Sequence, residues 1–203
     1  MLVIHYTGMK TCAEAKARLC DPNFEVSAHY LIEEDGTVHR LVDEDKRAWH
    51  AGVAWWRGGF DVNGHSIGIE LVNPGHEFGY KAFPEAQMLA LTNLSKSILS
   101  RHHICPQNVV GHSDIAPRRK LDPGELFDWQ RFAASGIGLW VENTTPMDIT
   151  DEQAAMMLSA YGYPLADLKA TITAFQRHFR PAKVDGIMDP ESAGILKALL
   201  DLI

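Results

Sequence analysis

The stretch SIGIELV, residues 66–72, is an apolar run that contains a single acid. A short apolar run with β-branched residues predicts a buried strand. Two other segments have the same character, LVIHYTG at residues 2–8 and NVVGH at residues 108–112. Each of the three segments carries a polar side chain capable of chemistry: His5, Glu70 and His112.

Helical segments and a hairpin alternate with these strands. Thr11 and Glu14 form a capping box that predicts the start of a helix. Residues 27–42 predict a β-hairpin, and Pro84 suits the first turn of a helix that continues to about residue 102. This mixture predicts an α/β fold with a central mixed β-sheet flanked by helices. Because active sites in such folds gather at strand ends, we expect the reactive side chains to do the same.

The character of the chain changes after residue 142. Residues 143–150 are polar, contain a proline and have no apolar period, which indicates a linker. Residues 151–203 predict three helices, and one of them has apolar side chains at helical spacing. We therefore predict a larger domain over residues 1–142 and a small three-helix domain over residues 151–203. The aromatic, glycine-rich residues 48–64 predict a long loop.

Composition argues against two classes of protein. Apolar residues make up 46% of the 203-residue chain, which is enough for a buried core. No apolar run of about 18 residues is present, so we expect no transmembrane segment. The net charge of −7, from 19 basic and 26 acidic residues, argues against a nucleic-acid partner. The spacing of the three cysteines matches neither a metal site nor a disulfide framework, so we predict free thiols. We also expect the protein to be a monomer.

The stretch GHSDIAPRRKLDPG, residues 111–124, gathers His112, Lys120 and Asp122 on a segment that two prolines should keep extended rather than helical. A hydrolytic zinc site takes three protein ligands and leaves one position for water. His5, His112 and Asp122 stand at strand–loop junctions where such convergence is possible. Taken singly, each of these side chains is more often an ordinary surface or hydrogen-bonded residue.

Five motifs follow one another along the chain: HYTG, SAHYLI, AWHAG, NGHSIGIELVN and GHSDIAPRRKLDPG. Together they closely resemble the zinc-dependent N-acetylmuramoyl-L-alanine amidases of the AmpD and AmiD type. That family is related to phage T7-type lysozyme and to the peptidoglycan recognition proteins. The resemblance covers residues 1 to about 140 and implies their fold for the larger, catalytic domain. The tail, with AFQRHFRP and VDGIMDPES, resembles a small peptidoglycan-binding domain less closely.

The resemblance also implies residue roles. His5, His112 and Asp122 match the family's zinc ligands, and the T7-type branch has a cysteine where Asp122 stands. Glu70 matches the residue that takes a proton from water, and Lys120 matches a lysine that stabilises the oxyanion. One departure is that Ala28 stands where the T7-type branch has a catalytic tyrosine.

Substrate contacts are predicted for four further residues. The aromatic rings of Trp49 and His50 suit sugar and peptide faces, and the guanidinium of Arg119 suits a stem-peptide carboxylate. Asn63 matches a position that the family associates with substrate contact.

The implied reaction is hydrolysis of the amide bond between N-acetylmuramic acid, or its 1,6-anhydro form, and the L-alanine of the peptidoglycan stem peptide. Two alternatives stay open: a module that binds muropeptide without cutting it, and a zinc hydrolase of another amide. A wall-binding tail favours the cell envelope or periplasm. Free thiols and the lack of a signal peptide favour the cytoplasm, although a trimmed N-terminus is expected because a predicted strand begins at residue 2.

Overall fold

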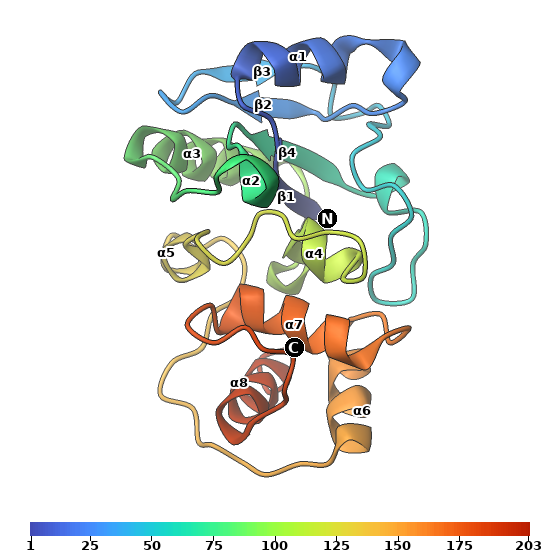
Figure 1. The fold of residues 1–203 in the computed structure, drawn as a ribbon, viewed down its shortest axis with the longest axis vertical. Helices are drawn as coiled ribbons and strands as arrows, with labels where there is room; N and C mark the ends of the chain where they lie inside the picture. Colours follow the sequence, from blue (N-terminus) through green and yellow to red (C-terminus); the bar gives the residue numbers. More distant parts are fainter.

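A computed structural model describes residues 1–203, and its centre is a five-stranded mixed sheet. The strand order is β3-β2-β4-β1-β5 (Figure 1). Strand β1 pairs in parallel with β4 and β5, β2 pairs in parallel with β4, and β3 pairs antiparallel with β2. The predicted mixed sheet is therefore confirmed. The strands are β1 Leu2–Tyr6, β2 Tyr30–Ile32, β3 Val38–Arg40, β4 Ile67–Leu71 and β5 Val109–Gly111.

Eight helices accompany the sheet, and none combines the length and the apolar character that crossing a bilayer demands. The predicted cap is present at Thr11, whose hydroxyl accepts a hydrogen bond from the Glu14 backbone N–H. Thr150 caps the first helix of the tail in the same way. The helices are α1 Cys12–Cys20, α2 Gly75–Phe78, α3 Glu85–Arg101, α4 His112–Ile115, α5 Trp129–Ala134, α6 Asp151–Tyr161, α7 Leu168–Phe179 and α8 Pro190–Leu200.

Helix α4 corrects one prediction. Residues 111–124 were expected to be free of helix, yet His112–Ile115 form a helical turn. The prolines of the segment begin only at Pro117, so they leave the first four residues free to coil. The turn ends at Ala116, because the residue before a proline avoids the helical region.

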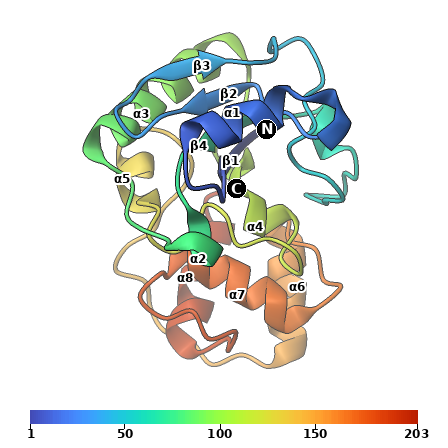
Figure 2. The same ribbon diagram turned by 45° about the horizontal axis from the view of Figure 1, so that its top comes forward.

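The two faces of the sheet are covered by different elements. Side chains alternate along a strand, so Leu2 and Ile4 of β1 point to one face and Val3 and His5 to the other. The first face packs against α3 and α5 through one hydrophobic cluster. The second face is covered by α1 at one end and by α4 and the loop of residues 48–64 at the other (Figure 2). His5 therefore lies on the second face, beneath loops.

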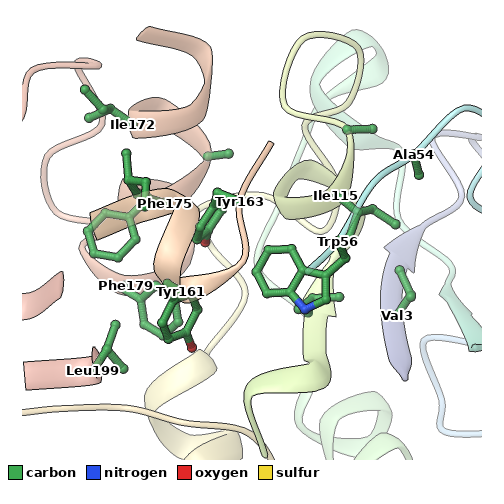
Figure 3. Close-up of a cluster of buried hydrophobic side chains, with 14 of the residues drawn as sticks. Val3, Ala54, Trp56, Ile115, Tyr161, Tyr163, Ile172, Phe175, Phe179 and Leu199 are labelled. Atoms are coloured by element: carbon green, nitrogen blue, oxygen red, sulfur yellow. The ribbon is translucent and has the colours of Figure 1, made fainter. Parts of the chain in front are cut away.

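The three helices of the tail pack against this second face. A single cluster of 18 buried residues joins Val3 and Val110 of the sheet to residues of α6, α7 and α8 (Figure 3). Trp56, from the long loop, lies between the two parts, with its ring centroid 5.0 Å from that of Tyr163. Residues 143–150 contain no helix or strand, as expected of a connecting segment. The division into separate domains remains a prediction.

Candidate active site

Three donor atoms from distant parts of the chain meet at the carboxyl end of β1. His5 lies in that strand, His112 opens α4, and Asp122 follows in the loop after α4. The Nδ1 atoms of the two histidines are 2.9 Å apart, and each lies 3.0 Å from Oδ2 of Asp122. All three side chains are buried. The predicted convergence of these residues is thus present in the structure.

The hydrogen bond made by Nε2 of His112 indicates which ring nitrogen of this histidine is available to a metal. Nε2 of His112 lies 3.0 Å from the carbonyl oxygen of Ala51, which can only accept, so the proton of His112 resides on Nε2. Nδ1 of His112 then presents a lone pair to Nδ1 of His5 and to the carboxylate. Electron-rich nitrogen and carboxylate oxygen atoms this close together would be stabilised by a bound cation.

Zinc fits this donor set. Zinc binds imidazole nitrogen and carboxylate oxygen at about 2.0–2.2 Å, and tetrahedral ligands at that range lie roughly 3.3–3.6 Å apart. The observed triangle of atoms, with sides of 2.9, 3.0 and 3.0 Å, is slightly smaller, and small rotations of the side chains would supply the difference. Burial, followed by the neighbouring His112, lowers the pKa of His5 to about 4, so its imidazole is neutral near pH 7.

Glu70 lies beside the cluster on β4, in register with His5 on β1. Paired residues on neighbouring strands point to the same face, so Glu70 shares the face of His5. Its Oε2 is buried and has no hydrogen-bond partner. Burial, and then the charge of Asp122, raise the pKa of Glu70 well above its usual value, while Lys120 opposes the rise. This carboxyl group is therefore suited to taking up a proton.

A cleft of about 600 Å³ opens onto these groups. That volume suits a small-molecule ligand. Lys120 and the half-exposed Trp49 line the cleft together with Glu70, His112 and Asp122. Of the predicted site residues, His5 and Asn63 are absent from the lining.

Arg119 and Asn63 both bond to the long loop. The Arg119 guanidinium donates to the carbonyl oxygens of Ala51 and Val53. The side-chain oxygen of Asn63 accepts from the backbone N–H groups of His50 and Ala51. The structure therefore places Asn63 outside the cleft lining, where it holds the backbone of the long loop. Arg119 reaches the cleft wall with part of its hydrogen-bonding capacity already used.

His50 supports His5 rather than facing open solvent. Nδ1 of His50 lies 3.0 Å from Nε2 of His5, and its Nε2 lies 3.1 Å from the hydroxyl of Ser66. A side chain at Gly68 would collide with the His50 ring, which explains why a glycine interrupts the apolar β4 strand. His50 was predicted to bind substrate, but both of its ring nitrogens are engaged within the protein.

The substitution His50→Phe should weaken zinc binding, because it keeps a ring over Gly68 but removes the nitrogen that lies 3.0 Å from Nε2 of His5. Loss of such a supporting partner typically costs about 10- to 100-fold in metal affinity. The zinc dissociation constant, measured by competition with a chromophoric chelator, checks this. Ser66→Ala, which leaves the contact between His5 and His50 intact, serves as the milder comparison. Equal zinc affinity in His50→Phe and the wild type would contradict the supporting role.

A hydrogen-bonded group at the edge of the cleft was not predicted from the sequence. The Tyr6 hydroxyl lies 2.8 Å from Nδ1 of His76, and Nε2 of His76 lies 3.2 Å from Glu125. Tyr6 and His76 line the cleft. His76 belongs to the four-residue helix α2, which is too short to leave a periodic pattern in the sequence.

Comparison with known proteins agrees with this geometry. The model of a family described as N-acetylmuramoyl-L-alanine amidase matches residues 1–125, a range that contains all five of the residues predicted as zinc ligands or catalytic groups. N-acetylmuramoyl-L-alanine amidase AmiD of Escherichia coli (strain K12) is 39% identical over 231 residues, covering 99% of this chain and 82% of AmiD. The 1,6-anhydro-N-acetylmuramyl-L-alanine amidase AmpD of Citrobacter freundii is 43% identical over 112 residues, covering 55% of this chain and 58% of AmpD.

A solved structure of Escherichia coli AmiD also matches the whole chain. It is a complex with the substrate anhydro-N-acetylmuramic acid-L-Ala-D-gamma-Glu-L-Lys, and it superposes with a TM-score of 0.91 at 38% identity. The match covers 100% of this chain and 88% of that one. The similarity to AmiD therefore includes the three tail helices, whereas the alignment with AmpD spans only about half of the chain.

Proposed function

Since the chain belongs to the N-acetylmuramoyl-L-alanine amidase family and is an enzyme of that class, we propose that it uses zinc to cut the bond between N-acetylmuramic acid and the L-alanine of the peptidoglycan stem peptide. The 1,6-anhydro form of the sugar is included in this proposal. The observation that carries it is the meeting of His5, His112 and Asp122 next to the unpartnered Oε2 of Glu70.

The relatives support the choice of substrate. The AmiD structure is a complex with its substrate, an anhydro-muramyl tripeptide. AmpD carries the anhydro sugar in its name. The AmiD match covers the whole chain, including the part that forms the cleft, so the same class of muropeptide is the natural candidate here.

His5, His112 and Asp122 would hold the zinc ion through two nitrogens and one oxygen. A bound zinc ion supplies Lewis acidity, which polarises an amide carbonyl and makes water more acidic near neutral pH. Glu70 would accept a proton from the attacking water at its free Oε2 and later deliver it to the departing amine of L-alanine. Its raised pKa suits both transfers, because a carboxyl group with a pKa nearer neutrality can be protonated and deprotonated in one cycle.

Lys120 would stabilise the charge that develops on the former carbonyl oxygen. It lines the cleft together with Glu70 and Asp122, and its ammonium group contributes positive charge in a partly enclosed site. Trp49, which also lines the cleft, offers a half-exposed indole face for the sugar or the peptide. Arg119 remains our candidate for a stem-peptide carboxylate.

The tail and the location of the enzyme belong to the same proposal. The resemblance of the tail to a small peptidoglycan-binding domain supports a role for residues 151–203 with polymeric peptidoglycan, and hence a place in the cell envelope. The alternative is the cytoplasm, with soluble anhydro-muropeptide as the main substrate.

Mass spectrometry of the reaction products tests the proposal. Incubation with sacculi and with a soluble anhydro-muramyl peptide should release free stem peptides that begin with L-alanine, and a chelator should stop the release. Ordinary N-acyl amino acids should stay intact. Binding of muropeptide without cleavage by the zinc-loaded protein would instead favour a recognition module, and cleavage of the N-acyl amino acids would favour a different amide hydrolase.

A further inference from the structure

Asp114 is a fully buried carboxylate that the proposed reaction does not use. Its two oxygens accept three hydrogen bonds of 2.7 Å each. One donor is the backbone N–H of Gly111, the second is the hydroxyl of Tyr163, and the third is Nδ1 of His178. A buried carboxylate with this many donors is expensive to leave partly unsatisfied, so its partners should matter for local structure.

The carboxylate of Asp114 closes the helical turn that carries His112. It stands at the third position of α4, and the bond from the Gly111 N–H spans the start of that helix. A helix of four residues has almost no stability of its own. The direction of the His112 side chain therefore depends on what holds Asp114 in place.

Two of the three donors come from the tail. Tyr163 follows α6 and is fully buried, with its ring packed against Trp56 (Figure 3). His178 lies on α7 and stacks on Trp129, with ring centroids 3.7 Å apart and an interplanar angle of 18°. Because aromatic packing holds both rings, their polar atoms are fixed where Asp114 needs them.

We propose that Tyr163 and His178 are positioning residues, which act through Asp114 and α4 to orient His112 for metal binding. The proposal rests on the proposed function, since it assumes that His112 is a metal ligand. It gives the tail helices a part in building the metal site, in addition to any part they have in binding the cell wall.

The test separates loss of the hydrogen bonds from loss of packing. Tyr163→Phe removes only the hydroxyl, and His178→Phe keeps an aromatic ring against Trp129 but has no donor. His178→Asn is the conservative variant, because its side-chain amide can donate from a position near that of Nδ1. Leu196→Ala, on α8, is the control: it removes a fully buried side chain from the same hydrophobic cluster and makes no contact with Asp114 through a hydrogen bond.

Zinc dissociation constants, kcat and KM, and the melting temperature of the metal-free protein are measured for all variants. Tyr163→Phe and His178→Phe should each weaken zinc binding about 10-fold and lower kcat while KM stays nearly constant. His178→Asn should recover most of the zinc affinity. Leu196→Ala should lower the melting temperature and leave the zinc dissociation constant unchanged.

Two results would overturn the proposal. One is wild-type zinc affinity in both Tyr163→Phe and His178→Phe. The other is a loss of zinc affinity in Leu196→Ala as large as theirs, which would mean that any loosening of the tail has the same effect. If His178→Phe does not fold, the zinc dissociation constant of Tyr163→Phe is the deciding measurement, and a wild-type value would overturn the proposal. A wild-type protein without a zinc site would refute the proposed function itself, an outcome that the wild-type titration detects separately.

Discussion

Glu70→Gln should lower kcat by about 10²- to 10⁴-fold, the usual contribution of a general acid–base group. Glutamine has the same shape as glutamate but cannot accept a proton. In the proposed mechanism, the unpartnered Oε2 of Glu70 is the atom that accepts and releases the proton, and the substitution removes this ability. KM and the zinc dissociation constant should stay close to the wild-type values, because Glu70 is not part of the ligand triangle. Steady-state kinetics on a soluble anhydro-muramyl peptide, with zinc content measured in parallel, checks this.

Glu77→Gln is the matched control for this experiment. Glu77 also lines the cleft, but it is exposed and lies on α2, away from the sheet. The same chemical change at this position should leave kcat nearly unchanged. Substantial activity in Glu70→Gln would refute the assigned proton transfer while leaving the zinc site and the fold in place.

Asp122→Asn should abolish zinc binding at working concentrations, and activity with it. The substitution removes the only negative charge among the three donor atoms and leaves two neutral imidazoles, a weaker and incomplete set. A ligand present at 100 times its dissociation constant stabilises a protein by about 2.7 kcal/mol. For a chain of this size that corresponds to a rise in melting temperature of roughly 5–10 °C. Added zinc should produce such a rise in the wild type and almost none in Asp122→Asn.

Asp148→Asn provides the comparison, since Asp148 is exposed in the segment that connects to the tail. It should respond to zinc like the wild type. A full zinc-induced rise in the melting temperature of Asp122→Asn would show that the metal binds elsewhere and would remove the basis of the proposed site.

Local patterns predicted the longer elements of the fold well. The β-strands, the hairpin and the helices α1, α3, α6, α7 and α8 follow from apolar periods and from capping residues such as Thr11 and Thr150, whose signals lie within a few residues. The turn at α4 could not be predicted in this way, because its cap is completed by Tyr163 and His178, which are distant in sequence. Helix α5 was missed for a related reason, since six residues contain too little of a period.

The candidate site was likewise predicted only in part from local sequence patterns. Strand ends suggested where His5 and His112 would lie, but spacing alone could not show that they meet Asp122; the family resemblance supplied that expectation. The supporting position of His50 could not be read from the sequence. The His50 ring occupies the space that a side chain at Gly68 would fill, and the two residues meet only when β4 and the long loop pack together.

The pairing of His5 with Glu70 across two hydrogen-bonded strands has an evolutionary consequence. The distance between these two side chains is set by the spacing of the sheet, whereas Trp49 and His76 approach the cleft from a loop and a short helical turn. Insertions or exchanges in those outer segments can therefore reshape what the enzyme accepts without disturbing the atoms that react. Such a division allows descendants of one ancestral hydrolase to diversify toward polymers or small fragments while keeping the same chemistry.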